Sequence, residues 1–298
     1  MQSDIDEWIS HYIELEYYAN GFSEYVMDML LSAEGDCDDI ILSSDYYNTK
    51  GQYGKAAKGI KERTESLMDE IKSYIDGESE GVVSKELDWL LAISGGILAY
   101  RQAIMPSKVL FTPFNGRDTV DTFRAKLSSN IVRAYDNALR SGYTFSSPAS
   151  DIRRAAKQNL SSIERGLKSD LQTMATSFAK TADRIVFMDD ADSIQSYVWV
   201  ATLDGHTCLV CADLNGTRYR NIDNAPSCPV HNLCRCFLYP ELNGRIEVPT
   251  FQEWIDGQDE ETQREVLGKS RYEMYKAGTK VDTFVNSGRL LTLKELGE

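Results

Sequence analysis

Proline, histidine and long apolar runs are scarce in this 298-residue chain, and each scarcity narrows what the protein can be. None of the seven prolines precedes Pro106, so long uninterrupted helices are permitted over the first third of the chain. Only three histidines are present, which leaves little material for histidine-based catalysis. The most apolar stretch, residues 89–100, is shorter than the roughly 18 residues of a membrane-spanning helix, so we expect no membrane segment.

Positive charge is scarce in one part of the chain only. The first 50 residues contain twelve acidic residues and a single basic one, Lys50, whereas the remaining 248 contain 31 basic and 34 acidic residues. An acidic head of this kind repels a polyanion, which disfavours nucleic-acid binding through bulk charge. It also lacks the positive charge of a secretion signal, so we expect a soluble protein made in the cytoplasm.

The N-terminal two-thirds of the chain reads as helical. Large apolar residues are spaced among acids over residues 4–33, and a second amphipathic stretch covers residues 53–75. Two glycines and polar residues between 77 and 81 predict a linker. Residues 85–105 are apolar nearly all round, which predicts a buried helix that ends at Pro106.

The strongest periodicity lies between residues 147 and 188. Ten apolar residues recur there at intervals of three and four, in an eleven-residue repeat that keeps one stripe on one face of a long helix. They are Ile152, Ala156, Leu160, Ile163, Leu167, Leu171, Met174, Phe178, Ala182 and Ile185. We interpret the stripe as a core face, with an oligomer seam as the alternative.

A middle section from Arg117 to Lys180 carries eleven basic and six acidic residues, a net charge of +5. Arg153, Arg154 and Lys157 lie close together near the start of the long helix. Such bases are typical of the solvated face of an amphipathic helix, and binding of an acidic partner or DNA is the alternative interpretation.

Five of the six cysteines crowd into residues 208–236, after a predicted strand at 197–202. A tight cluster in a cytosolic chain favours a metal site over a disulfide scaffold. Cys208 and Cys211 form a C-x-x-C hook, and His231, Cys234 and Cys236 supply the second hook. Zinc takes four such ligands, so one of the five is surplus, and the sequence leaves open which.

Other interpretations of the cluster stay open beside the metal. Disulfides across the two hooks are the main alternative, and reduced thiols are a further one. Cys228, which precedes Pro229, is the least favoured ligand. Neither the H-x-E of zinc deaminases nor H-E-x-x-H occurs, and we interpret His206 as a turn residue that packs on the first hook. We therefore predict a structural zinc site and no enzymatic activity.

The same segment resembles the C-terminal module of the phage Mu F-like minor head proteins, the phage head morphogenesis family. The matching residues are Trp199, Asp204, Thr207, Cys208, Cys211, Leu214, Gly216, His231, Cys234, Arg235 and Cys236. Residues 179–181 resemble the element that ends the family's long helix, and segments at 251–254, 263–272 and 292–296 resemble its tail. The resemblance covers residues 180–298. His206 stands where the family has arginine, and Ala182 where an acid often follows the threonine.

The resemblance implies a virion structural protein, a minor capsid protein of a bacteriophage located in the head interior or at the portal vertex. Its implied partners are the portal protein, other phage head proteins and packaged DNA, with no small-molecule substrate. Two other functions stay open: a zinc-hook nucleic-acid-processing enzyme or toxin, which needs a general base near the metal, and a DNA-binding structural protein that uses the basic middle section.

The predicted fold is mainly α, with a long-helix N-terminal domain followed by a small α+β, metal-stapled C-terminal module. The expected divisions are a helical domain with its acidic head at 1–146, a long connecting helix at 147–188 and a Mu F-like module at 189–298.

Overall fold

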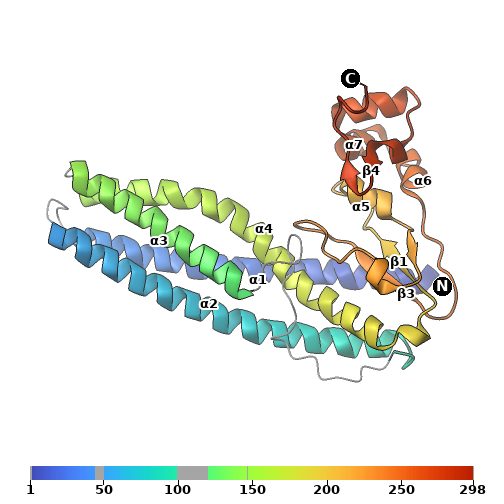
Figure 1. Cartoon of the computed structure of the whole chain (residues 1–298), viewed down its shortest axis with the longest axis horizontal. Coiled ribbons are helices and arrows are strands. Elements are labelled where there is room, and N and C mark those ends of the chain that lie inside the picture. The colour runs from blue at the N-terminus through green and yellow to red at the C-terminus, as the bar shows by residue number, and fades with distance from the viewer. Residues whose placement is uncertain (1, 44–49, 99–119, 146, 298) are drawn as a thin grey trace.

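A computed structural model describes residues 2–43, 50–98, 120–145 and 147–297. Four long helices form an elongated bundle in which successive helices run in opposite directions (Figure 1). They are α1 (Gln2–Leu42), α2 (Lys50–Ile93), α3 (Val120–Phe145) and α4 (Ala149–Asp189). A smaller region with a few short strands follows them, so the predicted mainly α fold with a small α+β C-terminal region is confirmed.

The apolar stripe predicted on the long helix is a core face. All of its ten residues except Ile163 and Ile185, which are half-buried, are buried in α4. Helix α4 packs against α1, α2 and α3, so the stripe lies along the axis of the bundle. The alternative of an oligomer seam is not needed to explain it.

The linker predicted at residues 77–81 is wrong, because α2 runs through it without a break. Ser79 in its middle is buried, and so are Ile75 and Val82 on either side. A helical glycine costs roughly 1 kcal/mol relative to alanine. Burial of one apolar side chain contributes more than that, about 1.5–3 kcal/mol, so the packed face keeps the segment helical.

The helix predicted at residues 85–105 is also wrong in its extent. Helix α2 ends at Ile93, and Gly95 and Gly96 follow with φ of 59° and 81°. This left-handed backbone is accessible to glycine at little cost and stops a right-handed helix. Residues 99–119, including Pro106, lie outside the described residues.

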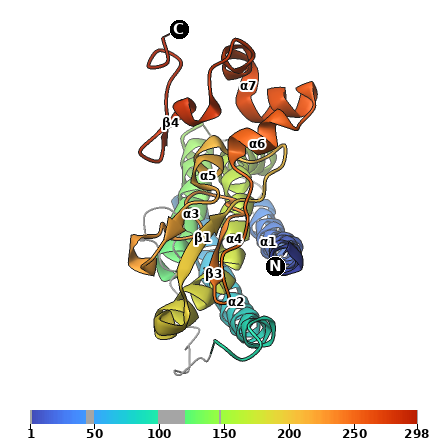
Figure 2. The ribbon, with the colours of Figure 1, turned by 90° about the vertical axis from the view of Figure 1, so that its right-hand side faces the viewer.

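A three-stranded antiparallel sheet closes one end of the bundle, as Figure 2 shows. Strand β1 (Ser196–Val200) lies between β2 (Arg218–Tyr219) and β3 (Phe237–Glu241), with Trp199 opposite Leu238. The ring of Phe237 on β3 stacks on Tyr12 of α1 at 4.3 Å between centroids, with Trp8 beside it. Sheet and bundle therefore share one hydrophobic core.

A second, smaller core supports the C-terminal arm, which rises from the sheet end and makes the molecule L-shaped (Figure 1). The arm contains α6 (Phe251–Asp256), α7 (Glu260–Lys276), β4 (Val285–Asn286) and β5 (Arg289–Leu290). Phe251, Ile255 and Phe284 fill its core together with Leu209 from the short helix α5 (Leu209–Leu214). Short 3-10 turns complete the chain at Ala191–Ser193, Ile222–Asn224 and Val281–Phe284.

None of the described helices combines the length and apolar character needed to cross a membrane. The division of the chain at residues 146 and 188 stays a prediction.

Candidate metal centre

The first hook is built by the turn between β1 and α5. The Asp204 N–H donates to Thr207 Oγ1 at 2.8 Å, and the Thr207 hydroxyl donates to the carbonyl of Thr202 at 2.5 Å. Cys208 is the N-terminal cap of α5, and its Sγ accepts the Cys211 N–H at 3.3 Å. One helical turn therefore presents both sulfurs of the C-x-x-C hook to the same side.

All five predicted ligand residues converge on one place. Sγ of Cys208 and Sγ of Cys211 lie 3.0 and 3.1 Å from Nε2 of His231, and Sγ of Cys211 lies 3.9 Å from Sγ of Cys234. The ligand atoms form two groups, Cys208–Cys211–His231 and Cys211–Cys234–Cys236, each within 4.8 Å. Cys211 belongs to both groups and is the centre of the cluster.

The spacing of these atoms fits a tetrahedral metal ion. With Zn–S near 2.3 Å and Zn–N near 2.0 Å, tetrahedral geometry places ligand atoms about 3.5–3.8 Å apart. The Cys211–Cys234 sulfur pair at 3.9 Å matches this value, and the two sulfur–imidazole pairs are somewhat closer. The ligand residues are buried or half-buried. Among the residues that the structure describes, no Asp or Glu side chain belongs to either group. The cluster can therefore hold a metal ion.

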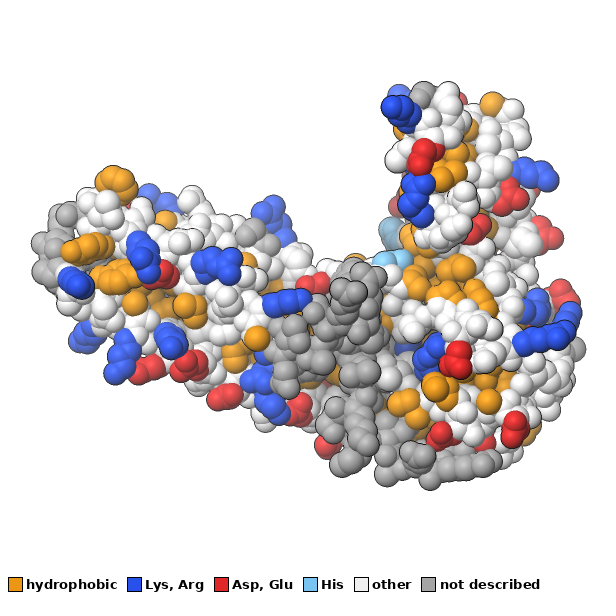
Figure 3. Space-filling view, viewed as in Figure 1, with side chains coloured by type: hydrophobic (Ala, Val, Ile, Leu, Met, Phe, Trp, Pro, Cys, Tyr) orange, Lys and Arg blue, Asp and Glu red, His pale blue; other side chains and the backbone are white. Residues whose placement is uncertain are grey.

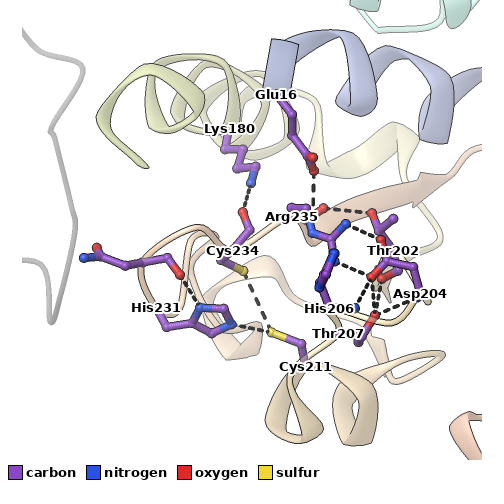
Figure 4. Close-up of polar contacts among 11 residues, drawn as sticks. Glu16, Lys180, Thr202, Asp204, His206, Thr207, Cys211, His231, Cys234 and Arg235 are labelled. Carbon is purple, nitrogen blue, oxygen red and sulfur yellow. Dashed lines mark hydrogen bonds and ion pairs between the residues drawn. The ribbon is translucent and has the colours of Figure 1, made fainter. Parts of the chain in front are cut away.

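The second hook is fastened to the long helix α4. Nζ of Lys180, a buried lysine, donates to the carbonyl of Cys234 at 2.6 Å, as Figure 4 shows. The Leu233 N–H donates to Thr173 Oγ1 at 2.9 Å, and the Asn232 side chain donates to Asp170 at 2.8 Å. Three polar side chains of α4 thus hold the His231–Cys236 loop in position.

A salt bridge beside the cluster joins the turn before the first hook to the second hook. The Arg235 guanidinium donates two hydrogen bonds to the Asp204 carboxylate, and its Nε lies 3.8 Å from Glu16 of α1 (Figure 4). Burial by itself raises the pKa of Asp204, but the hydrogen bonds from Arg235 and the His206 N–H outweigh it and hold the pKa below its usual value. The pair is bidentate, the geometry in which Arg–carboxylate contacts are strongest.

The thiols and the imidazole of the cluster shift one another's pKa values. The neighbouring Cys211 thiol, with His231 and the Cys211 N–H, lowers the pKa of Cys208 to about 4 against the effect of burial. In turn, the hydrogen bond to Cys208 raises the pKa of His231 to about 9. The N–H and imidazole donors around Cys208 therefore favour a thiolate, the form that binds metals.

The remaining cysteines lie outside the cluster. All six cysteines are among the described residues and none forms a disulfide. Cys228 lines a small pocket with Tyr12 and Phe237, where burial raises its pKa, and it belongs to neither ligand group. Cys37 is buried in α1. The disulfide alternative therefore has no support in the structure.

His206 lies on the predicted turn but does not pack on the hook. Its side chain is 81% exposed, and its Nδ1 lies 3.7 Å from Glu265 of α7. A side chain on the exposed tip of a tight turn finds no apolar surface to cover, and a carboxylate on the neighbouring arm is its nearest partner.

Sequence reasoning missed the residues that position the second hook. Thr173 lies in the long amphipathic helix without a distinctive pattern, and Lys180 belongs to the resembling segment 179–181, which gave no indication of a contact with the second hook. A signal did exist for the salt bridge, because Asp204 and Arg235 are both among the residues that carry the resemblance.

Comparisons of the chain with protein-family models, with curated proteins and with solved structures give no match.

Proposed function

We propose that this protein is a minor head protein of a bacteriophage that associates with the portal vertex, acts as a structural adaptor in head assembly and DNA packaging or delivery, and is not an enzyme. A structural zinc ion in the Cys/His cluster fixes the corner of the adaptor. The portal protein and other head proteins are its partners, and it resides in the virion.

The observation that carries this proposal is that the cysteine and histidine residues of the resembling motif converge into one closed arrangement. Residues separated by up to 28 positions, from Cys208 to Cys236, meet around Cys211. The two charged residues that accompany them, Asp204 and Arg235, bind each other. A carboxylate engaged in this way supports the fold and is not free to act as a general base, which favours a structural metal over a catalytic one.

A metal in this cluster supplies folding free energy, because a site assembled from distant hooks exists only in the folded chain. Cys211 belongs to both groups of ligand atoms, so we place the surplus ligand among the other four candidates. Cys208 and His231 complete one side of the site, and Cys234 and Cys236 the other.

The basic residues of the middle section give little support to a DNA-binding role. Arg153 lies 3.7 Å from Asp38, and Arg154 lies 2.9 Å from Asp151. Exposed pairs of this kind contribute little stability, yet each acid offsets the positive charge that phosphate binding requires.

The zinc prediction is tested by elemental analysis of the purified protein. We expect about one equivalent of zinc per chain in the wild type and less than a tenth of that in Cys211→Ser, because the shared ligand is lost. Cys37→Ser is the matched control and should keep its zinc, since Cys37 lies in the helical core. Less than half an equivalent in the wild type would contradict a structural zinc site.

The portal association is tested by co-expressing the chain with the portal protein encoded in the same genome. We expect the chain to co-purify with portal rings through size-exclusion chromatography. Rings that elute without the chain, at concentrations where both are soluble, would count against the proposed function.

A further inference from the structure

The inner corner of the L contains a hollow beside the metal centre. It has a volume of about 520 Å³ and is walled by α1, α4, the first-hook turn and the second-hook loop. Figure 3 shows the surface hollowed at this corner, with a histidine side chain at its edge. A hollow of this size accommodates one or two large side chains of another molecule.

Leu233 lines the hollow in an unusual state. Its φ is 57°, a left-handed backbone that glycine and asparagine adopt far more readily than leucine. Its side chain is nevertheless 50% exposed, so it gains little from burial in this chain. The ligands His231 and Cys234 on either side, and the Leu233 N–H bond to Thr173, hold it there. A leucine kept at a backbone cost and left open to solvent is suited to contact another molecule.

The charge around the hollow is negative. Its one described arginine, Arg235, is already engaged by Asp204 and Glu16. Glu265 stands at the edge beside His206 with half of its side chain exposed. The wall formed by α1 contains neither lysine nor arginine between Gln2 and Leu42. On the α4 wall, Lys180 is buried against the Cys234 carbonyl and Lys168 is paired with Glu24 of α1, so neither is free to face an occupant of the hollow. An apolar floor with an acidic rim complements an apolar side chain flanked by positive charge.

We infer that this corner hollow is a docking site for a segment of a partner protein that carries a bulky apolar side chain between lysine or arginine residues. The inference rests on the adaptor role proposed above and names the surface through which the adaptor holds its partner. Leu233 and the partner's apolar side chain form the buried centre of the contact, and the acidic rim selects the basic flanks.

The test uses full-length, zinc-loaded protein on a solid support and two synthetic pools of nonapeptides. Each pool has a central leucine, methionine or phenylalanine, flanked in one pool by lysine and arginine and in the other by aspartate and glutamate. We expect the basic pool to be retained at least tenfold more than the acidic pool. Leu233→Asn should abolish this preference, because asparagine tolerates the left-handed backbone but removes the apolar side chain.

Leu31→Asn is the matched control, because Leu31 is 51% exposed on α1, at a position that does not line the hollow. It should retain the basic pool as the wild type does. Zinc content and thermal unfolding midpoint of Leu233→Asn should equal or exceed those of the wild type, which separates lost docking from lost folding.

Equal retention of the two pools, or a preference unchanged in Leu233→Asn, would overturn the docking site. A wild-type dimer that Leu233→Asn dissociates in sedimentation would also overturn it, by making a second copy the occupant. If Leu233→Asn still co-purifies with portal rings, the docking site is wrong while the proposed function stands. If peptide retention behaves as expected but wild-type protein does not co-purify, the proposed function fails and the docking site remains.

Discussion

Two acidic side chains lie inside the bundle, where carboxylates are rarely found. Glu86 of α2 and Asp183 of α4 are 1% and 4% exposed. Nε2 of His11 lies 2.9 Å from both carboxylate oxygens of Glu86, and the Tyr12 hydroxyl donates to Asp183. Burial raises the pKa of Glu86 to about 7, although Asp183 and Lys180 act against it, and burial also raises the pKa of Asp183.

This residue pair predicts that the fold loses stability as the pH rises. Folded Glu86 keeps its proton up to about pH 7, whereas in the unfolded chain the proton leaves near pH 4.5. The contribution of the protonated form is therefore lost between these two values. Relative to Glu86→Gln, which stays neutral, the wild type should lose about 2 kcal/mol of unfolding free energy between pH 5 and pH 8.

Urea unfolding of both proteins at the two pH values measures this change. Because His11 contacts Glu86 directly and burial lowers its pKa, the same comparison is made in a His11→Gln background, where the imidazole titration is absent. A difference between wild type and variant that stays constant with pH would show that Glu86 is already ionised in the folded protein.

Among the elements, the contact between α3 and α4 leaves no room for a side chain at one glycine of α3. A Cβ added at buried Gly142 would lie 2.3 Å from the side chain of Ile152, closer than van der Waals contact permits. Gly166, in the exposed middle of α4, has no atom within 4 Å of the same position. A larger residue is therefore excluded at Gly142, whereas the structure leaves room for one at Gly166.

Alanine substitutions separate these two cases. Gly166→Ala should stabilise the protein by up to about 1 kcal/mol, because alanine has the higher helix propensity. Gly142→Ala should destabilise it by about 1–2 kcal/mol, because overpacking against Ile152 exceeds the same gain. Urea unfolding at one pH measures both, and a stabilised Gly142→Ala would show that the α3–α4 contact adjusts without cost.

A helix or strand can be predicted from the sequence when residues close to it in the chain determine it. The eleven-residue repeat predicts a helix at 147–188, and α4 covers Ala149–Asp189. The glycines show the limit of this reasoning. Those at 77 and 81 remain helical because their neighbours are packed, whereas Gly95 and Gly96 end α2. Packing against distant segments decides between these outcomes, and a local pattern does not contain it.

The metal cluster follows the same rule. The ligands of each hook lie close together in the sequence, so all five candidates between Cys208 and Cys236 could be predicted from their spacing. The surplus of one ligand could not be settled, because it depends on how the two hooks approach each other in space. The attachment of the second hook to Lys180 was hidden for the same reason, since 54 residues separate Lys180 from Cys234.

For the whole molecule, the cluster lies where bundle, sheet and C-terminal arm meet, and metal removal should therefore loosen one part selectively. With a zinc chelator, we expect trypsin to cleave at Arg218, Arg220 and Arg235 at least tenfold faster, because the hooks lose their common centre. Arg63 on α2 should stay protected, since α2 is held by its packing against α1, α3 and α4.

Limited proteolysis followed by mass spectrometry identifies the sites that become accessible. The chelator should leave the cleavage pattern of Cys211→Ser unchanged, because that variant has already lost its metal. Identical cleavage patterns for the wild type with and without chelator would mean that a metal in the cluster does not stabilise this region of the fold.

The unbroken course of α4 has a geometric consequence for the proposed adaptor. The second hook touches this helix at Asp170 and Thr173, and the helix begins at Ala149 at the opposite end of the bundle. At 1.5 Å per residue, roughly 35 Å of rigid rod separates the two places. If the proposed partners bind at the N-terminal tip of α4 and at the corner beside the second hook, this helix keeps a constant distance between them.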